Sequence, residues 1–182
     1  MVDLPTKGII LGKQFWGTHK TAMDLQTIAA QTRLPVRTIR YVLDHRLLPG
    51  QRRVTGQPDL VGRARVLTDL EGFSVACAAT LLESGVRREA VVDFMSALTG
   101  YSVGKNARKT RPMGAIQWAF EATTPAKAML GDGVNLRFEL DREDTGWIQP
   151  GTFARLADDY QPRAIVTIDL AQLRQAFLDS KR

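Results

Sequence analysis

The chain has 182 residues, of which 44% are hydrophobic and 24% charged, and its 25 lysines and arginines against 19 acids give a net charge of +6. This composition suits one domain or two small ones with a buried core, and it excludes wholesale disorder. The single cysteine, Cys77, excludes an internal disulfide and a cysteine-rich zinc site. With no apolar run long enough for a membrane span, we expect a cytoplasmic protein without a cofactor or a membrane partner.

The positive charge is concentrated in two stretches. Residues 1–65 hold 11 basic and 4 acidic residues, and residues 101–114 hold 4 basic and none acidic. The remaining stretches, residues 66–100 and 115–182, have net charges of −3 and −2. A localised positive field favours a polyanion as partner, because each neutralised phosphate releases condensed counterions. A solvated surface gives the same pattern, so the charge alone does not decide between them.

The first third of the chain predicts a loose arm followed by two short helices. Residues 1–22 hold several glycines and a proline without a sustained period. Helical spacing of apolar residues then predicts a helix over 24–32 with Asp24 as N-cap, and a second over 35–46. Pro35 ends the first helix, because it disfavours helical backbone at the preceding residue, and it suits the first turn of the second.

Three further helices are predicted in the middle of the chain, after a polar loop that contains Gly56 and Pro58. The first covers 60–70 and is closed by Gly72 as a C-cap. The second begins after Ser74 as its N-cap and ends near residue 84. The third covers 86–98 and has apolar residues at helical spacing.

In the last third of the chain the sequence pattern changes from helices alone to a mixture of helices and strands. Residues 100–114 predict a basic linker, followed by a short helix over 115–122. Strand patterns follow over 126–130 and 134–140, around a tight turn at 131–133. We expect a helix over 152–160, a strand over 164–168 and a final helix capped by Asp169. The aromatic residues expected to fill a second core here are Trp118, Phe120 and Trp147.

Two short helices joined by a tight turn, the second of them basic, predict a helix-turn-helix. A helix fits the major groove of DNA when its exposed side offers donors to phosphates and base edges. With Val36, Ile39 and Leu43 facing the core, the outer and flanking faces carry Arg37, Thr38, Arg40 and Tyr41. The arginine fork can bind bases or phosphates, and the hydroxyls can bind phosphates. The loop over 51–57 lies where a wing would cross the adjacent backbone.

The segment LQTIAAQTRLPVRTIRYVLDHRLLPG, residues 25–50, resembles the start of a MerR-type winged helix-turn-helix. The strongest match is the run 37–41, followed by Leu-Leu-Pro at 47–49, and it continues through Gly-Phe-Ser-Val at 72–75. The resemblance covers about residues 23–85 and implies that Arg40, Tyr41 and the wing hold the DNA backbone. Arg33 stands where the family usually has a glycine in the turn, and a left-handed backbone there costs a non-glycine residue about 1–2 kcal/mol.

We therefore expect an α+β protein with an N-terminal arm (1–22), a MerR-like winged helix-turn-helix with following helices (23–99), a basic linker (100–114) and a C-terminal α+β module (115–182). The expected function is a sequence-specific, bacterial-type DNA-binding transcriptional regulator that inserts the helix over 35–46 in the major groove. The sequence leaves two alternatives open: a recombination or partition factor of a mobile element, and a protein-interaction adaptor that has lost DNA binding. The candidate DNA-binding residues are Arg37, Thr38, Arg40, Tyr41, Arg52, Arg53, Gln57 and Arg63.

The expected partners are double-stranded DNA and a second copy of the chain, and the sequence names no small-molecule effector. A reader of this shape usually pairs across two half-sites. The helix over 86–98 is too short for the long dimerisation helix of the resembled family. The dimer is therefore assigned to the strand over 164–168 and to an apolar stripe of the last helix, formed by Leu170, Leu173 and Phe177.

Catalysis is not expected. An enzyme needs a nucleophile with a base, a phosphate loop or clustered carboxylates. The one acidic cluster is typical of an exposed turn and consists of Glu139, Asp141, Glu143 and Asp144. We interpret Cys77 as a small buried residue rather than a sensor, and His19 and His45 as surface histidines.

Overall fold

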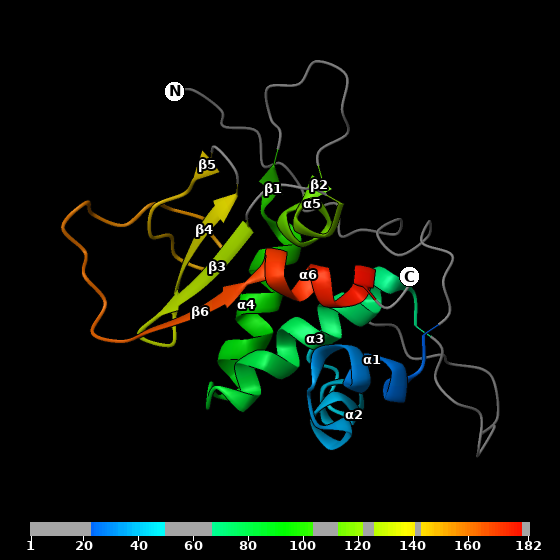
Figure 1. Ribbon diagram of the computed structural model, residues 1–182. Coiled ribbons are helices and arrows are strands. Elements are labelled where there is room, and N and C mark those ends of the chain that lie inside the picture. Colours follow the sequence, from blue (N-terminus) through cyan, green and yellow to red (C-terminus); the bar gives the residue numbers. More distant parts are fainter. Residues whose placement is uncertain (1–22, 50–66, 104–112, 122–125, 141–142, 180–182) are drawn as a thin grey trace, which may run out of the picture.

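The computed structural model describes residues 23–49, 67–103, 113–121, 126–140 and 143–179. It is an α+β structure in which helices pack on one face of an antiparallel sheet (Figure 1). The helices are α1 Leu25–Thr32, α2 Val36–Asp44, α3 Asp69–Glu83, α4 Arg88–Gly100, α5 Ala115–Glu121 and α6 Leu170–Asp179. The strands are β1 Ser102–Val103, β2 Met113–Gly114, β3 Ala126–Gly131, β4 Asn135–Leu140, β5 Glu143–Asp144 and β6 Ile165–Asp169.

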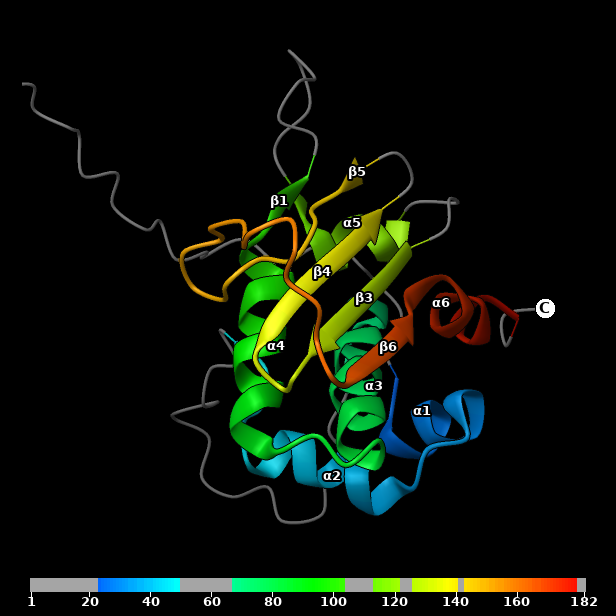
Figure 2. The same cartoon turned by 90° about the vertical axis from the view of Figure 1, so that its left-hand side faces the viewer.

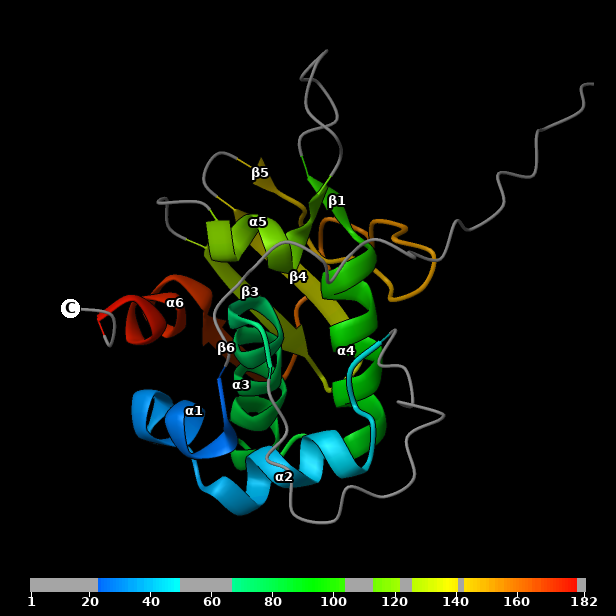
Figure 3. The ribbon, with the colours of Figure 1, turned by 90° about the vertical axis from the view of Figure 1, so that its right-hand side faces the viewer.

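Helix α3 is the centre of the fold. Every residue from Gly72 to Ala79 is buried, as expected for a helix that is apolar on all sides. Helices α1 and α2 lie across one end of it, and the sheet lies along its side (Figure 3). Because α3 contacts α1, α2, α4, α5, α6 and β6, the position of α2 is fixed by the same helix that supports the sheet.

The start of α3 corrects the prediction of two separate helices there. Thr68 and Glu71 form a capping box, with the Glu71 amide 3.2 Å from Thr68 Oγ1, so the helix begins before Gly72 and passes through Ser74. The Ser74 hydroxyl donates to the Leu70 carbonyl at 2.7 Å and caps nothing. Gly72 lies at a tight contact, because a Cβ there would lie 3.2 Å from Phe177 Cε1. The glycine that resembles a stop signal is therefore a site of close helix approach.

The described part of the predicted helix over 60–70 also differs from the prediction. Leu67 forms an antiparallel bridge with Met23, with backbone hydrogen bonds of 2.7 and 2.8 Å, before α3 begins. The helix predicted over 86–98 is confirmed as α4, shifted by two residues at each end.

The main sheet has the strand order β5-β4-β3-β6, and all of its pairs are antiparallel. The strands predicted over 126–130, 134–140 and 164–168 are confirmed within one residue, and the final helix is capped by Asp169 Oδ1, which accepts from the Gln172 amide at 2.9 Å. The inner face is apolar: Ala128 pairs with Phe138 and Ile168, and all three are buried. The outer face carries polar residues such as Lys127 and Arg137.

The helix predicted over 152–160 is wrong. This segment is irregular and crosses the outer face of the sheet (Figure 2). Phe153 has a left-handed backbone with φ of 55°, and its ring packs on Tyr101 at 5.6 Å. Backbone bonds join the segment to the preceding chain, with the Leu156 amide 2.8 Å from the Trp147 carbonyl. These contacts replace the bonds of a helix.

The C-terminal residues share the core of the N-terminal ones. Buried residues from Met23 to Phe177 form one cluster, so the predicted linker does not divide the core. Phe177 of α6 packs edge-on against Phe73 of α3, with ring centroids 6.0 Å apart. The apolar stripe expected to form a dimer interface is therefore used inside the chain, since Leu170 and Phe177 are buried there.

The three predicted core aromatics have different places. Phe120 packs on Phe73 with ring centroids 5.3 Å apart, and Trp118 is half-buried against the core. Trp147 lies on the outer face of the sheet, where its ring covers Gly131 and leaves no room for a Cβ. None of the helices in the described part of the chain is long and apolar enough to span a membrane.

Candidate nucleic-acid interface

The α1–α2 pair is built by caps and a tight turn. Asp24 caps α1 by accepting from the Thr27 amide at 2.7 Å, and this hydrogen bond lowers the pKa of the Asp24 carboxyl. Helix α1 ends at Arg33, whose φ of 59° and ψ of 22° are left-handed, as expected for the position where the resembled family has glycine. Pro35 precedes α2, and its carbonyl accepts the first helical bonds. Three residues thus join the two helices.

Helix α2 separates its residues into two faces. The buried face consists of Thr38, Ile39, Val42 and Leu43. The opposite, exposed face consists of Arg37, Arg40, Tyr41 and Asp44. Their spacing of three, one and three residues places all four on one stripe of a helix. Arg37, Arg40 and Tyr41 are thus brought together as the sequence predicts; we call this set, together with Asp44, the α2 stripe.

Thr38 has a different role from the one that the sequence suggests. Its side chain is nine-tenths buried, and its hydroxyl donates to Glu83 Oε1 at the end of α3. This contact holds α2 on α3. A hydroxyl used in this way does not face a ligand that approaches the α2 stripe.

The end of α2 continues the exposed surface. The Tyr41 ring is 39% exposed and packs on the His45 ring, with centroids 4.0 Å apart. Arg46 follows in a left-handed conformation, with φ of 53°, and is exposed. Two exposed arginines with left-handed backbone, Arg33 and Arg46, therefore flank α2. Neither arginine is among the residues that the sequence predicts to bind DNA, although their positions at the two ends of the basic helix are a signal for it.

The arginines of the α2 stripe are not neutralised. In the described part of the chain, neither Arg37 nor Arg40 makes an ion pair or a hydrogen bond through its side chain. An exposed guanidinium keeps its five donors available for an incoming anion. The remaining candidates, Arg52, Arg53, Gln57 and Arg63, and the predicted wing lie outside the described residues.

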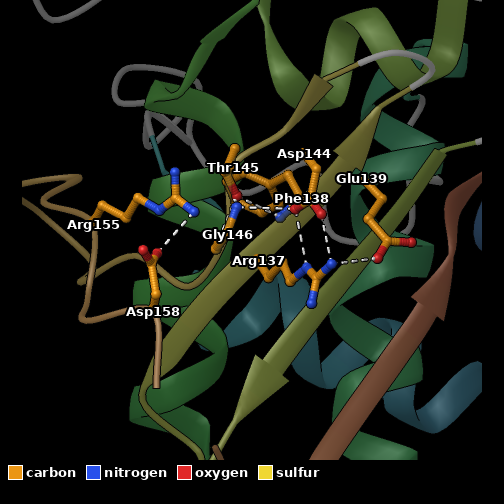
Figure 4. A network of polar contacts seen from close by, with 8 residues as sticks. All are labelled: Arg137, Phe138, Glu139, Asp144, Thr145, Gly146, Arg155 and Asp158. Carbon is orange, nitrogen blue, oxygen red and sulfur yellow. Dashed lines mark hydrogen bonds and ion pairs between the residues drawn. The ribbon is translucent and has the colours of Figure 1, made fainter. Parts of the chain in front are cut away.

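The arginines of the sheet are paired instead (Figure 4). Arg137 donates to both carboxylate oxygens of Asp144, at 3.0 and 2.5 Å, and lies 3.2 Å from Glu139. This hydrogen bonding holds the pKa of Asp144 below its usual range and raises that of Arg137. Arg155 pairs with Asp158 at 3.0 Å. The part of the acidic cluster that the structure describes thus orders the outer face of the sheet.

An open polar groove of about 400 Å³ lies beside these pairs. It is lined by Arg137, Trp147, Arg155 and Tyr160 among others. The charged side chains of its lining pair with one another, Arg137 with Asp144 and Arg155 with Asp158. The Tyr160 hydroxyl donates to Asp132 and accepts from Asn135, at 3.0 and 2.8 Å. The groove therefore presents to a ligand no charged side chain that lacks a partner among the described residues.

The other reactive side chains do not form a site in the described residues. Cys77 is fully buried in α3, and burial raises the pKa of its thiol, which keeps it in the unreactive protonated form. Within the described ranges no three histidine, cysteine, aspartate or glutamate residues gather as metal ligands. His45 lies on the surface against Tyr41, and His19 is outside the described residues.

Comparison of the chain with protein-family models, with curated proteins and with solved structures finds no match.

Proposed function

We propose that this protein is a DNA-binding regulator in which α1 and α2 form a helix-turn-helix of the MerR-like type and α2 enters the major groove. The observation that carries the proposal is the α2 stripe, which presents on one exposed helix face a tyrosine and two arginines that have no partner among the described residues. A helix with this face fits the width of the major groove, where arginine forks read guanine edges and bind phosphates.

The packing behind α2 supports this role. Helix α1 and the C-terminal end of α3 hold α2 from its buried side, and the Thr38–Glu83 hydrogen bond fixes one contact between α2 and α3. The α2 stripe therefore belongs to a rigid element. Rigid presentation matters because base readout depends on the orientation of a few side chains.

The proposal divides three exposed residues of α2 between two tasks. Arg40 and Tyr41 bind phosphates, and Arg37 reads a base edge. Thr38 is left out, because its hydroxyl is used within the fold. Arg52, Arg53, Gln57 and Arg63 belong to the proposed wing and bind the neighbouring backbone. Their position in the sequence, directly after α2, supports this assignment.

Dimerisation is part of the proposal. One short helix contacts too few base pairs for strong selectivity, whereas a two-fold dimer reads two half-sites one helical turn apart. The regulator is proposed to bind its operator as a homodimer.

Fluorescence anisotropy with a random-sequence duplex at ~50 mM salt tests the core of the proposal. We expect the full chain to bind, and Arg40→Ala and Tyr41→Phe to weaken binding to all duplexes alike, because phosphates carry no sequence information. The matched control is Arg155→Ala, which removes an exposed arginine from the other side of the fold. Equal loss in the control and in Arg40→Ala, or no binding by the wild-type chain, contradicts the proposal; the second result favours the adaptor.

Selection from a random duplex library tests the assignment of Arg37. We expect Arg37→Ala to relax the preference at one position, at a cost of about 1–3 kcal/mol. Loss that is uniform over all sequences would move Arg37 to the backbone-binding set. Genome-wide footprinting then separates a regulator, which occupies promoters, from a mobile-element factor, which occupies a few clustered sites.

A further inference from the structure

The two edges of the main sheet are built differently. One edge is β5, which has only two residues, Glu143 and Asp144, both acidic. Short, charged edge strands of this kind resist pairing with another chain. The other edge is β6, which has five residues and, in the part of the chain that the structure describes, pairs with β3 alone. Its sequence from Ile165 to Ile168 consists of β-branched residues, which favour strand pairing.

The backbone of β6 presents hydrogen-bonding groups at this edge. The Ala164 carbonyl accepts from the Asp132 amide at 2.9 Å, so the backbone of Ala164 faces β3. In an antiparallel strand the direction alternates with each residue. Ile165 and Thr167 therefore direct their N–H and C=O groups away from β3. Both are exposed, Ile165 by 51% of its surface.

We propose that β6 pairs antiparallel with β6 of a second copy of this chain, about a two-fold axis through Val166. The proposal rests on the homodimer in the proposed function and names its surface. In this register Ile165 of each copy lies opposite Thr167 of the other. These two pairs exchange four backbone hydrogen bonds and join the two sheets into one of eight strands.

Side-chain complementarity selects this register. Arg163 of one copy lies opposite Asp169 of the other, twice by symmetry, and opposite charges in directly facing positions stabilise a strand pair. On the inner face Val166 meets Val166, and Ala164 meets Ile168. Each of these facing pairs therefore combines either two apolar side chains or a basic side chain with an acidic one.

The neighbouring registers lose these matches. A shift by two residues in one direction places Ile165 opposite Asp169, and a shift in the other places Arg163 opposite Thr167. Both shifts also separate the two charges.

The charged groups make no close ion pair that would compete with this pairing in the described residues. The Arg163 guanidinium forms no ion pair or side-chain hydrogen bond there, and its charge acts only as a minor cause of the lowered pKa of Asp132. Lys127 of β3 lies opposite Asp169 without an ion pair. Asp169 uses Oδ1 to accept from the Gln172 amide and cap α6. Its Oδ2 makes no hydrogen bond or ion pair with the described part of the chain, which leaves it for the second copy.

Cysteine cross-linking of the full chain, without DNA, tests both the pairing and the register. Val166 faces itself across the proposed axis, at a Cα separation that suits a disulfide. We expect Val166→Cys to form a covalent dimer on mild oxidation faster than Ile165→Cys or Thr167→Cys, its register controls. The native Cys77 is buried and does not compete. Faster cross-linking of either control, or none by Val166→Cys, overturns the proposed register.

Light scattering and sedimentation of the uncross-linked protein provide a second test. We expect the wild-type chain to be a dimer and Arg163→Glu to raise its dissociation constant roughly tenfold, because both charge pairs become repulsive. Thr167→Pro removes an outward N–H, leaves the β3 ladder intact and should give a folded monomer by circular dichroism. A monomeric wild-type chain, or a dimer that neither change weakens, overturns the proposal. Since no DNA is present, its failure leaves the test of DNA binding separate.

Discussion

The arginines of α2 and those of the sheet differ in what surrounds them. Arg37 and Arg40 project from one helix face without an ion pair in the described structure. Arg137 is held by Asp144 and Glu139, and Arg155 by Asp158. A guanidinium already bound to carboxylates must lose them before it binds a phosphate, whereas an exposed, unpaired one loses only water. Of these four arginines, the two of α2 are therefore the ones that the proposed function assigns to a phosphate.

The N-terminal helices and the C-terminal sheet with α6 are expected to unfold as one cooperative unit, because their buried residues form one cluster. Phe177→Ala removes a buried ring that packs on Phe73, and we expect a loss of about 3–5 kcal/mol in the free energy of unfolding. Urea unfolding followed by circular dichroism measures it, with Val134→Ala, at an exposed turn position, as the control. A single shifted transition supports a shared core. Two transitions, of which only one moves, would restore the separate C-terminal module.

A smaller effect is expected at the contact between α2 and α3. Thr38→Val keeps the shape of the side chain and removes its hydrogen bond to Glu83, at a cost of about 0.5–1.5 kcal/mol in stability. Under conditions where the variant is fully folded, DNA affinity should stay within twofold of wild type. A large loss of affinity in the folded variant would return Thr38 to the DNA-binding set.

Arg33→Gly should change stability and DNA binding in opposite directions. Its left-handed backbone costs a non-glycine residue about 1–2 kcal/mol, of which the greater freedom of unfolded glycine takes back a part. We expect a net gain of about 0.5–1 kcal/mol in urea unfolding. Anisotropy should show weaker binding to a random duplex, since a cation next to α2 is lost. Unchanged affinity would separate the turn from the interface.

The smallest effect concerns the pairing of Asp144 with Arg137. Because the folded pKa of Asp144 is depressed, its stabilisation is present above the unfolded pKa, near 3.9, and is lost as pH falls through the folded value. The pair is about half exposed, so we expect Asp144→Asn to cost less than about 1 kcal/mol at pH 7. This difference from wild type should shrink below pH 4. A difference independent of pH would contradict the ion-pair interpretation.

Local patterns in the sequence predicted much of the fold. The caps at Asp24 and Asp169, the hairpin of β3 and β4, and α4 are each specified by a few adjacent residues. One error overlooked a local signal: the capping box of Thr68 and Glu71 starts α3 before Gly72. The other errors occur where distant residues decide, as in residues 152–160, where Phe153 packs on Tyr101. The apolar stripe of α6 is likewise buried through a distant contact, because Phe177 packs on Phe73.

The candidate site was also predicted correctly where a local pattern decides it and incorrectly where a distant residue does. Helical spacing placed Arg37, Arg40 and Tyr41 on the outer side of α2. Helical spacing could not predict the role of Thr38, because its hydroxyl donates to Glu83, which lies 45 residues further along the chain. Nor could composition distinguish unpaired arginines from paired ones, since a charge count does not show which carboxylates lie nearby.

In the proposed function, phosphates are bound by the α2 stripe and not by the arginines of the sheet. The salt dependence of binding to a random duplex measures it directly, because the slope of log affinity against log salt is about −0.9 per neutralised phosphate. We expect Arg40→Ala to make the slope shallower by about 0.9 and Arg155→Ala to leave it unchanged. A slope unchanged by Arg40→Ala, or reduced equally by Arg155→Ala, would contradict the claim.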